Sequence, residues 1–548
     1  MSDLLRMTGM YSGMDTESIV SQLVKTKSTK VTNLKNEQKK LEWKQTAWQD
    51  LNSKIYNMYS KTLSNLRLTS AYSKKSTVSS DSTKATVVAS EGAVNGTQTL
   101  KVNKLAKSGY LTGAKLDGKT TTTTGTDGKD VTKVVNWETT DKLSEIDSNL
   151  TGKTISITTG SGTDAKTTDI EITADMTIND LVAKFKDAGV NASFDTTNQR
   201  FFINSTGTGS AKNFTLTSDD STALASLGLD PNTTYTDING SKNSCVKIEG
   251  QDAEIVLNGA TFVSDSNTFS INGLTINTLG VTDEEISLVT STDYDGIYNT
   301  IKDFLTEYND LINEMDKLYN ADSARKYDML TNDEKDSMTD DEVEQWEDKI
   351  KSALLRKDNS LYNVMNTLTT TMMDGYYENN LSDKQKKNMS ASEISAWYKE
   401  NGGKKHYLSD YGIGTLSYFE AQDNEHHAYH INGDADDEFT STKEDKLKAA
   451  IAEDPEGTAN FFATLCKTLY SKLDETMSES TEYSSIYKVY NDKQLKKDYK
   501  DYTTKISDAE DELNDYEDRW YNKFSKMEVA LSKLQSQTSS ISSMLGSN

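Results

Sequence analysis

Two long runs of helical heptad spacing, one toward each end of the chain, set the strongest limit on its fold. From residue 19 to about 66, and again from about 499 to 545, apolar or tolerated residues recur in alternating steps of four and three, as in a coiled-coil seam. Only Pro231 and Pro455 occur in 548 residues, so both runs are free of proline. We predict a long helix at each end. For the first run, an ordinary amphipathic helix packed on its own domain remains the alternative.

The two runs are predicted to pack as an antiparallel pair. Polar residues interrupt the seam, which costs stability but specifies register and partner number. Two consecutive steps of four between Tyr516 and Phe524 form a stutter, which predicts local unwinding of a supercoil. The predicted seam residues are Val20, Val24, Val31, Leu34, Leu41, Trp48, Ile55, Ile506, Leu513, Tyr516, Trp520, Met527, Leu531, Leu534, Ile541 and Leu545.

Opposite charges flank the two seams. Residues 25–45 hold seven lysines and two glutamates, whereas residues 506–518 hold seven acidic residues and no Lys or Arg. In an antiparallel pair these segments face each other, and their charges fix register and partner choice. The alternative is that each charge run only solvates its own helix. The predicted complementary residues are Lys35, Lys39 and Lys40 on the first helix and Asp508, Asp511 and Asp515 on the second.

Between the helices the pattern changes to short β-branched runs separated by Gly, Asn and Asp, which is typical of half-buried strands in antiparallel sheets. One helix interrupts the strands, and Thr177 with Asp180 predicts a capping box at its start. Residues 73–83 are predicted to be a loop or domain boundary, and the threonine run 120–124 an exposed turn or insertion. Strands are predicted at 85–89, 99–102, 200–204, 214–217 and 269–271.

This order predicts an α+β multidomain fold. The long terminal helices form an antiparallel coiled-coil or helical-bundle leg, and antiparallel β-rich head domains are inserted between them. The predicted divisions are a terminal coiled-coil segment (1–45 with 500–548), a helical leg domain with insertions (46–75 with 291–499), a β-rich head domain (76–150 with 235–290) and a second β-rich head domain (151–234).

Composition excludes several classes of protein. Asp and Glu outnumber Lys and Arg by 85 to 60, and the net charge of −25 argues against binding to nucleic acid or to anionic membrane surfaces. No run of about 18 apolar residues occurs, and the first residues lack the basic and apolar regions of a cleavable signal, so we expect neither membrane insertion nor a cleaved signal peptide. The two cysteines, Cys245 and Cys466, cannot form a disulfide scaffold or a four-thiolate zinc site.

Few residues are arranged for chemistry. His426, His427 and His430 lie near several aspartates and would bind zinc only if their rings converged. Residues 429–434 instead predict a strand entering a turn, which separates the rings. The acidic segment 331–348 is predicted to be a solvated helix face. Because no phosphate-binding glycine loop, nucleophile elbow or CxxC pair occurs, we predict no catalytic residues, no metal site and no cofactor.

A set of motifs follows a recognisable order along the chain. The motifs are TGMYSGMD (8–15), IVSQLV (19–24), GTQTLKVNKLA (96–106), TINDLVAKFKDAGVNASF (177–194), GQDA (250–253), INGLT (271–275) and SSISSMLG (539–546). In this order they resemble the flagellar filament cap family, also called hook-associated protein 2, and the fourth is similar to the flagellin-hook "IN" motif. Residues 118–130 and 376–407 depart from the family pattern and are predicted to be insertions.

The resemblance implies a non-enzymatic, extracellular protein at the tip of the bacterial flagellum, exported by the flagellar type III system with its chaperone. It implies a ring of about four to six copies whose helical legs contact flagellin and hook–filament junction proteins. Such a cap promotes flagellin folding and insertion and prevents loss of exported flagellin. The alternatives are another axial component, such as a junction protein, and a surface adhesin or glycan-binding protein. A glycan site requires exposed aromatic side chains, and Trp137 is the only tryptophan in the β region.

Overall fold

The computed structural model describes residues 11–124, 126, 129–237, 240–381 and 383–546. The chain forms two compact units, one combining Met1–Ser73 with Tyr294–Asn548 and the other comprising Lys74–Asp293. We call them the helical unit and the β unit and describe each by itself. In the part of the chain that the structure describes, no helix is long and apolar enough to cross a membrane.

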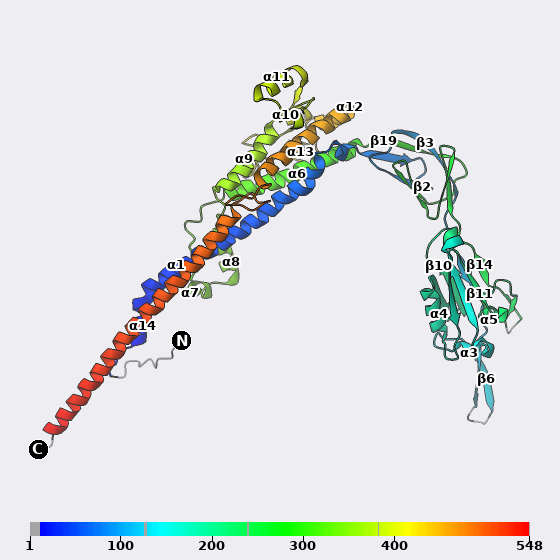
Figure 1. The fold of residues 1–548 in the computed structure, drawn as a ribbon, viewed down its shortest axis with the longest axis horizontal. Helices are drawn as coiled ribbons and strands as arrows, with labels where there is room; N and C mark the ends of the chain where they lie inside the picture. The colour runs from blue at the N-terminus through cyan, green and yellow to red at the C-terminus, as the bar shows by residue number, and fades with distance from the viewer. Residues whose placement is uncertain (1–10, 125, 127–128, 238–239, 382, 547–548) are drawn as a thin grey trace. The chain divides into compact units, whose positions relative to one another are not determined.

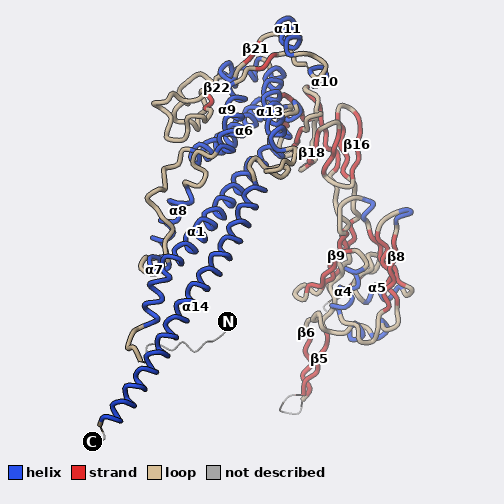
Figure 2. Tube along the Cα trace, turned by 60° about the vertical axis from the view of Figure 1, so that its left-hand side comes forward, coloured by secondary structure: helices blue, strands red, loops and turns tan. Residues whose placement is uncertain are grey.

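The helical unit is built on α1 (Thr16–Asn57) and α14 (Asp492–Leu545), which lie side by side (Figures 1 and 2). Both helices lack Gly and Pro, the residues that most weaken a helix interior. The chain continues from α1 through a π-helix, η1 (Met58–Leu63), into α2 (Ser64–Leu66). The other elements are η2 (Thr69–Tyr72), α6 (Tyr294–Tyr319), α7 (Asn332–Asp336), α8 (Asp340–Ser352), α9 (Asn359–Met373), β20 (Tyr376–Tyr377), α10 (Asp383–Lys386), α11 (Ala391–Asn401), β21 (Lys405–His406), η6 (Leu408–Tyr411), β22 (Ile413–Gly414), β23 (His430–Ile431), α12 (Lys446–Glu453) and α13 (Pro455–Met477).

The core of the helical unit lies where α6, α9 and α13 pack against the end of α1 and against η1. α6 contributes Phe304, Tyr308 and Ile312, which recur every four residues and so share one face of the helix. α13 contributes Phe462 and Leu469 to the same core. The acidic segment 331–348 forms α7 and most of α8, each opened by a capping box, and its residues are mostly exposed, as predicted.

The β unit contains two cores. One lies between a five-stranded sheet of order β1-β19-β3-β15-β16 and a three-stranded sheet of order β17-β18-β2. The other is formed by a four-stranded sheet of order β14-β4-β10-β9, a three-stranded sheet of order β11-β7-β8 and the helix α4. The strands are β1 (Lys75–Ser79), β2 (Ala85–Ala89), β3 (Gly96–Lys104), β4 (Tyr110–Thr112), β5 (Lys119–Thr124), β6 (Asp130–Val135), β7 (Thr154–Thr159), β8 (Lys166–Glu171), β9 (Val190–Asp195), β10 (Arg200–Ser205), β11 (Phe214–Ser218), β12 (Tyr235–Thr236), β13 (Lys242–Asn243), β14 (Val246–Ile248), β15 (Ala253–Leu257), β16 (Ala260–Ser264), β17 (Thr268–Ile271), β18 (Leu274–Thr278) and β19 (Ile286–Thr292). The helices are α3 (Leu143–Ile146), η3 (Ser148–Leu150), η4 (Gly162–Asp164), α4 (Ile178–Asp187), η5 (Ser210–Lys212) and α5 (Ser221–Ser226).

The second core is an insertion into the first. The chain passes between them near Lys107 and Gln251, which form an antiparallel bridge. Leu111 and Leu150 are buried in the second core together with Phe185 of α4. The boundaries predicted at 150/151 and 234/235 therefore fall inside this core, because the sequence pattern does not reveal which sheet each strand joins.

Several local predictions are confirmed and two hold only in part. The five predicted strands are present, and α4 begins with the capping box of Thr177 and Asp180. Residues 73–83 are not a loop throughout, since β1 pairs with β19, although the boundary between the two units does fall at Ser73. The threonine run 120–124 is not a turn: it lies in β5, which pairs with β6, because β-branched threonines fit a strand as well as a loop.

Candidate functional site

The pair formed by α1 and α14 is the candidate functional site, and we call it the helix pair. α1 is capped by Asp15, whose carboxylate accepts a hydrogen bond from the Ser18 amide at 3.0 Å. The contacts fix an antiparallel arrangement, since successive positions on α1 meet successively earlier positions on α14. Gln38 donates a hydrogen bond to Thr503 at 2.7 Å, and Lys30 lies 3.1 Å from Glu512. Thr8, Gly9 and Met10 of the opening motif lie outside the described residues.

The predicted seam is buried to different depths along the helix pair. On α1 the buried members are Val20, Val31, Trp48 and Ile55, whereas Val24, Leu34 and Leu41 are half-buried. On α14 only Ile506 is buried, and Leu513, Tyr516, Trp520, Met527 and Leu531 are half-buried. Leu534 and Ile541 are 58% and 57% exposed, and the side chain of Leu545 lies outside the described residues. The seam residues thus come together along most of α1, while the last turns of α14 show an apolar face to solvent.

The stutter carries a row of aromatic rings on one face of α14. The ring centroids of Tyr516 and Trp520 are 6.3 Å apart, and those of Trp520 and Phe524 are 6.1 Å apart. The Lys523 ammonium lies 4.5 Å from the Trp520 ring centroid, within cation–π range. α14 remains one continuous helix across this segment.

At its other end the helix pair is fixed by Trp48 and Asn52. Trp48 stacks on Tyr490 with ring centroids 5.0 Å apart. Asn52 is buried, accepts a hydrogen bond from the Val489 amide at 3.0 Å and donates one to the Tyr487 carbonyl at 3.2 Å. The prediction from the sequence did not include this bonding role of Asn52, although its presence as a polar residue in the seam was the available signal.

The charges meet across the helix pair, with acidic partners that differ from the predicted ones. Lys35 lies 2.6 Å from Glu510, and the hydrogen bond from Lys30 lowers the pKa of Glu512. Lys39 and Lys40 pair instead within α1, with Glu42 and Glu37. Among the described residues, Asp508, Asp511 and Asp515 form no ion pair. A role of these three aspartates in guiding assembly stays a prediction.

We expect the Lys35–Glu510 pair to contribute about 0.2–1 kcal/mol, since both side chains are largely exposed. The single reversals Lys35→Glu and Glu510→Lys should each lower the free energy of unfolding of the helical unit, and the double reversal should restore part of the loss. A double-mutant cycle measured by urea unfolding gives the coupling. The cycle Lys39→Glu with Asp508→Lys is the matched control and should show none. Equal coupling in the two cycles would contradict a specific register.

Glu528 of α14 holds the residues that precede α1, and its ionisation is expected to make this contact sensitive to acid. Its carboxylate accepts hydrogen bonds from the Ser12 hydroxyl and from the Tyr11 amide, the latter at 2.9 Å, and these bonds hold its pKa below the ordinary value. A carboxyl whose pKa is lowered by folding stabilises the folded form at neutral pH, and this stabilisation is lost as the pH falls below the ordinary value through the lowered pKa. We therefore expect residues 11–12 to detach from α14 in acid.

Hydrogen exchange read by mass spectrometry tests this expectation. The protection factor of the peptide containing Tyr11 and Ser12, corrected for the intrinsic exchange rate at each pH, should be high at pH 7 and fall at pH 3. In Glu528→Gln, which can accept hydrogen bonds but does not ionise, this acid step should be absent. If the protection factor falls by the same amount in Glu528→Gln, the detachment is caused by other carboxyl groups.

The histidine cluster does not converge. β23 is followed by a turn, as predicted, and His430 Nδ1 lies 2.7 Å from Asp437 Oδ2. The His426 ring stacks on Tyr418 with centroids 4.8 Å apart. Across the described residues, no group of three or more His, Cys, Asp or Glu side chains is placed to hold a metal ion.

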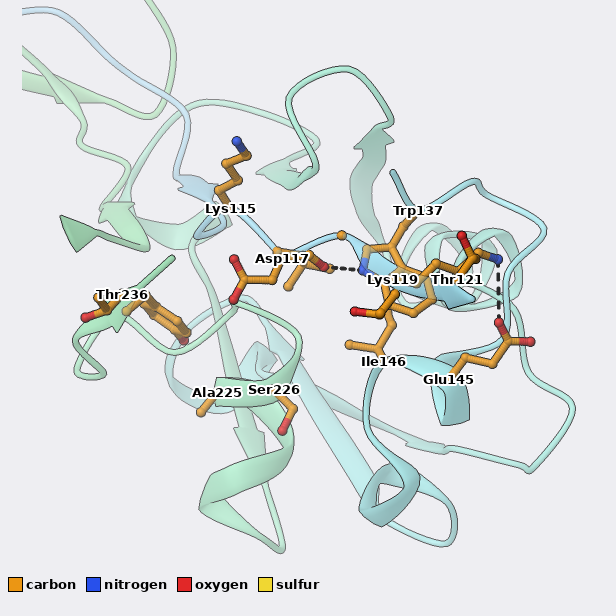
Figure 3. A pocket seen from close by; sticks show the side chains of 14 residues that line it. Lys115, Asp117, Lys119, Thr121, Trp137, Glu145, Ile146, Ala225, Ser226 and Thr236 are labelled. Atoms are coloured by element: carbon orange, nitrogen blue, oxygen red, sulfur yellow. Dashed lines mark hydrogen bonds and ion pairs between the residues drawn. The ribbon is translucent and has the colours of Figure 1, made fainter. Parts of the chain in front are cut away.

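An open pocket of about 710 Å³ lies in the β unit, near the base of the hairpin formed by β5 and β6 (Figure 3). Lys119 Nζ lies 2.6 Å from Asp141 and 3.6 Å from Glu145, so its charge is compensated within the protein, and the hydrogen bond to Asp141 raises the pKa of Lys119. Trp137 donates its indole N–H to the Asp117 carbonyl and is only 4% exposed, so its ring cannot stack on a sugar in solvent. Among the described lining residues, Ser226 donates its hydroxyl to Asp147 and the half-buried Tyr235 donates its hydroxyl to the Asp230 carbonyl, so both side chains are engaged within the protein.

Comparison with known proteins agrees with this picture. The profile described as "Flagellar hook-associated protein 2 C-terminus" matches residues 250–536, and the one described as "Flagellar hook-associated protein 2 N-terminus" matches residues 12–109. The flagellar hook-associated protein 2 of Halalkalibacterium halodurans is 24% identical over 586 residues, covering 98% of this chain and 99% of the relative. That of Thermotoga maritima is 26% identical over 382 residues, covering 69% of this chain and 53% of the relative.

Among solved structures, the D1-D2-D3 domains of the flagellar cap protein FliD from Escherichia coli align with a TM-score of 0.47 and 19% identity, covering 80% of this chain and 97% of that one. The two profiles lie in the order that the motifs predicted, and the C-terminal profile alone matches more than half of the chain. This chain belongs to the flagellar hook-associated protein 2 family.

Proposed function

We propose that the chain is a structural subunit of the cap at the distal tip of the flagellar filament, and that it catalyses no reaction. The observation that carries the proposal is the helix pair. It is assembled from the two ends of the chain and leaves Leu534 and Ile541 exposed on a face that has the spacing of a coiled-coil seam. Such a face is suited to binding other helices.

The remaining parts of the proposal follow the family. A ring of about four to six copies would promote folding and insertion of flagellin and prevent its loss, with flagellin and junction proteins as neighbours of the helix pair. We further propose export through the flagellar type III system with a chaperone, without a cleaved signal peptide. The matches to both hook-associated protein 2 profiles favour a cap over a junction protein, and the burial of Trp137 disfavours a glycan-binding role.

Genetic complementation tests the function. A strain lacking the gene should be non-motile and should release unassembled flagellin into the medium, and the intact chain supplied in trans should reverse both defects. Negative-stain electron microscopy of the purified chain should show rings. Normal filaments in the deletion strain would refute a role as the cap.

A further inference from the structure

The sheet of order β14-β4-β10-β9 has an unusual outer face. Its inner face packs on the core through Leu111 and Ile203, each at most 2% exposed. An antiparallel sheet with one face in water normally carries polar side chains on that face. Here Val246 and Phe202 flank Thr112 on adjacent strands, and Ile248 lies opposite Tyr110. The four large side chains on this face, which we call the apolar patch, are Tyr110, Phe202, Val246 and Ile248, and they are 38–55% exposed.

The apolar patch reaches the edge of its sheet. β14 is the outermost strand, and in the described part of the chain it pairs only with β4. An edge strand presents backbone N–H and C=O groups that can pair with a further strand. A strand added beside β14 would place alternate side chains next to Val246 and Ile248, because side chains on a strand alternate between faces.

The second feature is the hairpin of β5 and β6, which we call the β-arm. Its two strands pair only with each other among the described residues, and most of their side chains are exposed. Val131 and Val134 are 57% and 44% exposed, although they lie in the middle of a strand. A two-stranded hairpin is marginally stable in water unless a further strand or a packing surface supports it. By this rule the β-arm needs a further strand or a packing surface, and the described residues of the same chain provide neither.

We propose that the β-arm of one copy adds through β6 to the β14 edge of a second copy, by β-strand addition, and so packs beside Val246 and Ile248 at the margin of the apolar patch. This rests on the proposed function, in which copies of the chain assemble. Each chain has a net charge of −25, so copies repel each other except where positive groups approach. Residues 118–136 are close to neutral, with three lysines and two aspartates, and Glu249 beside Ile248 is paired with Lys247 at 2.5 Å, so little charge repulsion opposes the contact here.

The contact is heterologous, since the β-arm and the apolar patch are different surfaces of the same chain. Heterologous contacts repeat from copy to copy and close into a ring when the rotation between copies allows it. The proposal therefore makes a prediction about which variants can associate with each other.

Two variants separate the two surfaces. In the first, Asn-Gly replaces residues 120–134, which removes the exposed part of the β-arm and joins the paired residues Lys119 and Val135, so that the Lys119–Asp141 ion pair is kept. This deletion removes no buried residue of the second core, since the β-arm contributes none to it. In the second, Ile248→Asp places a charge in the apolar patch. The matched control is Val263→Asp on the edge strand β16, where the valine is 62% exposed. Circular dichroism establishes that each variant is folded.

Light scattering after gel filtration measures self-association of the full chain. The β-arm deletion and Ile248→Asp should each weaken self-association about tenfold or more, whereas Val263→Asp should match the unaltered chain. A mixture of the two weakened variants should form one-to-one pairs and nothing larger, because one supplies only an apolar patch and the other only a β-arm.

The possible failures are distinguishable. If the unaltered chain assembles and the β-arm deletion assembles equally well, the β-arm inference is refuted while the cap proposal stands. If the mixture stays monomeric, the β-arm does not bind the apolar patch of a second copy. If the unaltered chain fails both to assemble and to restore motility, the proposed function fails as well.

Discussion

Trp48→Ala is expected to lower the free energy of unfolding of the helical unit by about 3–5 kcal/mol, the usual cost of truncating a buried tryptophan. Trp48 is 1% exposed and stacks almost parallel on Tyr490, with an interplanar angle of 4°. Its removal opens a cavity between α1 and the segment before α14 and deletes the ring contact. Because the β unit has separate cores, its unfolding should be unchanged.

Urea unfolding followed by far-ultraviolet circular dichroism measures this loss in the helical signal. Trp43→Ala is the matched control, since Trp43 is half-buried and lies 5.1 Å from the Lys351 ammonium. Trp43→Ala should lower the free energy of unfolding of the helical unit by about 1 kcal/mol. Equal losses in the two variants would show that the stack on Tyr490 does not anchor the helix pair.

Replacing Leu534 and Ile541 together by aspartate should abolish cap function while leaving the fold intact. Both side chains are more than half exposed, so the chain itself gains little stability from them. Placed in a coiled-coil interface with another helix, two aspartates would bury charge without a partner and prevent packing. The last turns of α14 extend past the start of α1 in both views, which leaves this face available (Figures 1 and 2).

Swimming motility and flagellin in the medium report on function, and thermal unfolding reports on the fold. The control variant carries Gln535→Asp and Ser542→Asp, which add the same charge one position away from the seam and should retain motility. Full motility of the seam variant would show that the end of α14 has no essential partner. A large fall in melting temperature would place the two residues in a contact within the chain.

Heptad spacing was sufficient to predict α1 and α14 and to pair them, because a sustained apolar period leaves few other structures open to the chain. Charge counts predicted that the segments around Lys35 and residues 506–518 would face each other. They did not predict that Glu510 and Glu512 would be the partners, because total charge says nothing about which side chain points across the interface. α14 begins at Asp492, earlier than the predicted 499: Leu495, four residues before Tyr499, continues the seam spacing and packs against the core of the helical unit.

The β unit was harder to predict for a physical reason. Local propensity identifies a strand but not its neighbour, and pairings here join distant residues, as between Lys75 and Thr292. For this reason the strands were found while the division into two cores was misplaced. The β5–β6 hairpin was missed because threonine runs resemble low-complexity loops. Its strands are exposed on both faces, so they also lack the alternation of apolar and polar residues by which a half-buried strand is recognised.

The contact between Tyr11 and Glu528 joins residues 517 positions apart in the sequence. Such a contact cannot form until nearly the whole chain is present, and closing so long a loop is slow and entropically costly. The β unit, by contrast, can fold from its own residues as soon as they are available. A chain that emerges from one end first therefore folds its β unit early and its helical unit last. A product cut short by premature termination or proteolysis would carry a folded β unit without a complete helical unit. The pairing of the two ends therefore excludes truncated copies from any assembly that depends on the helical unit.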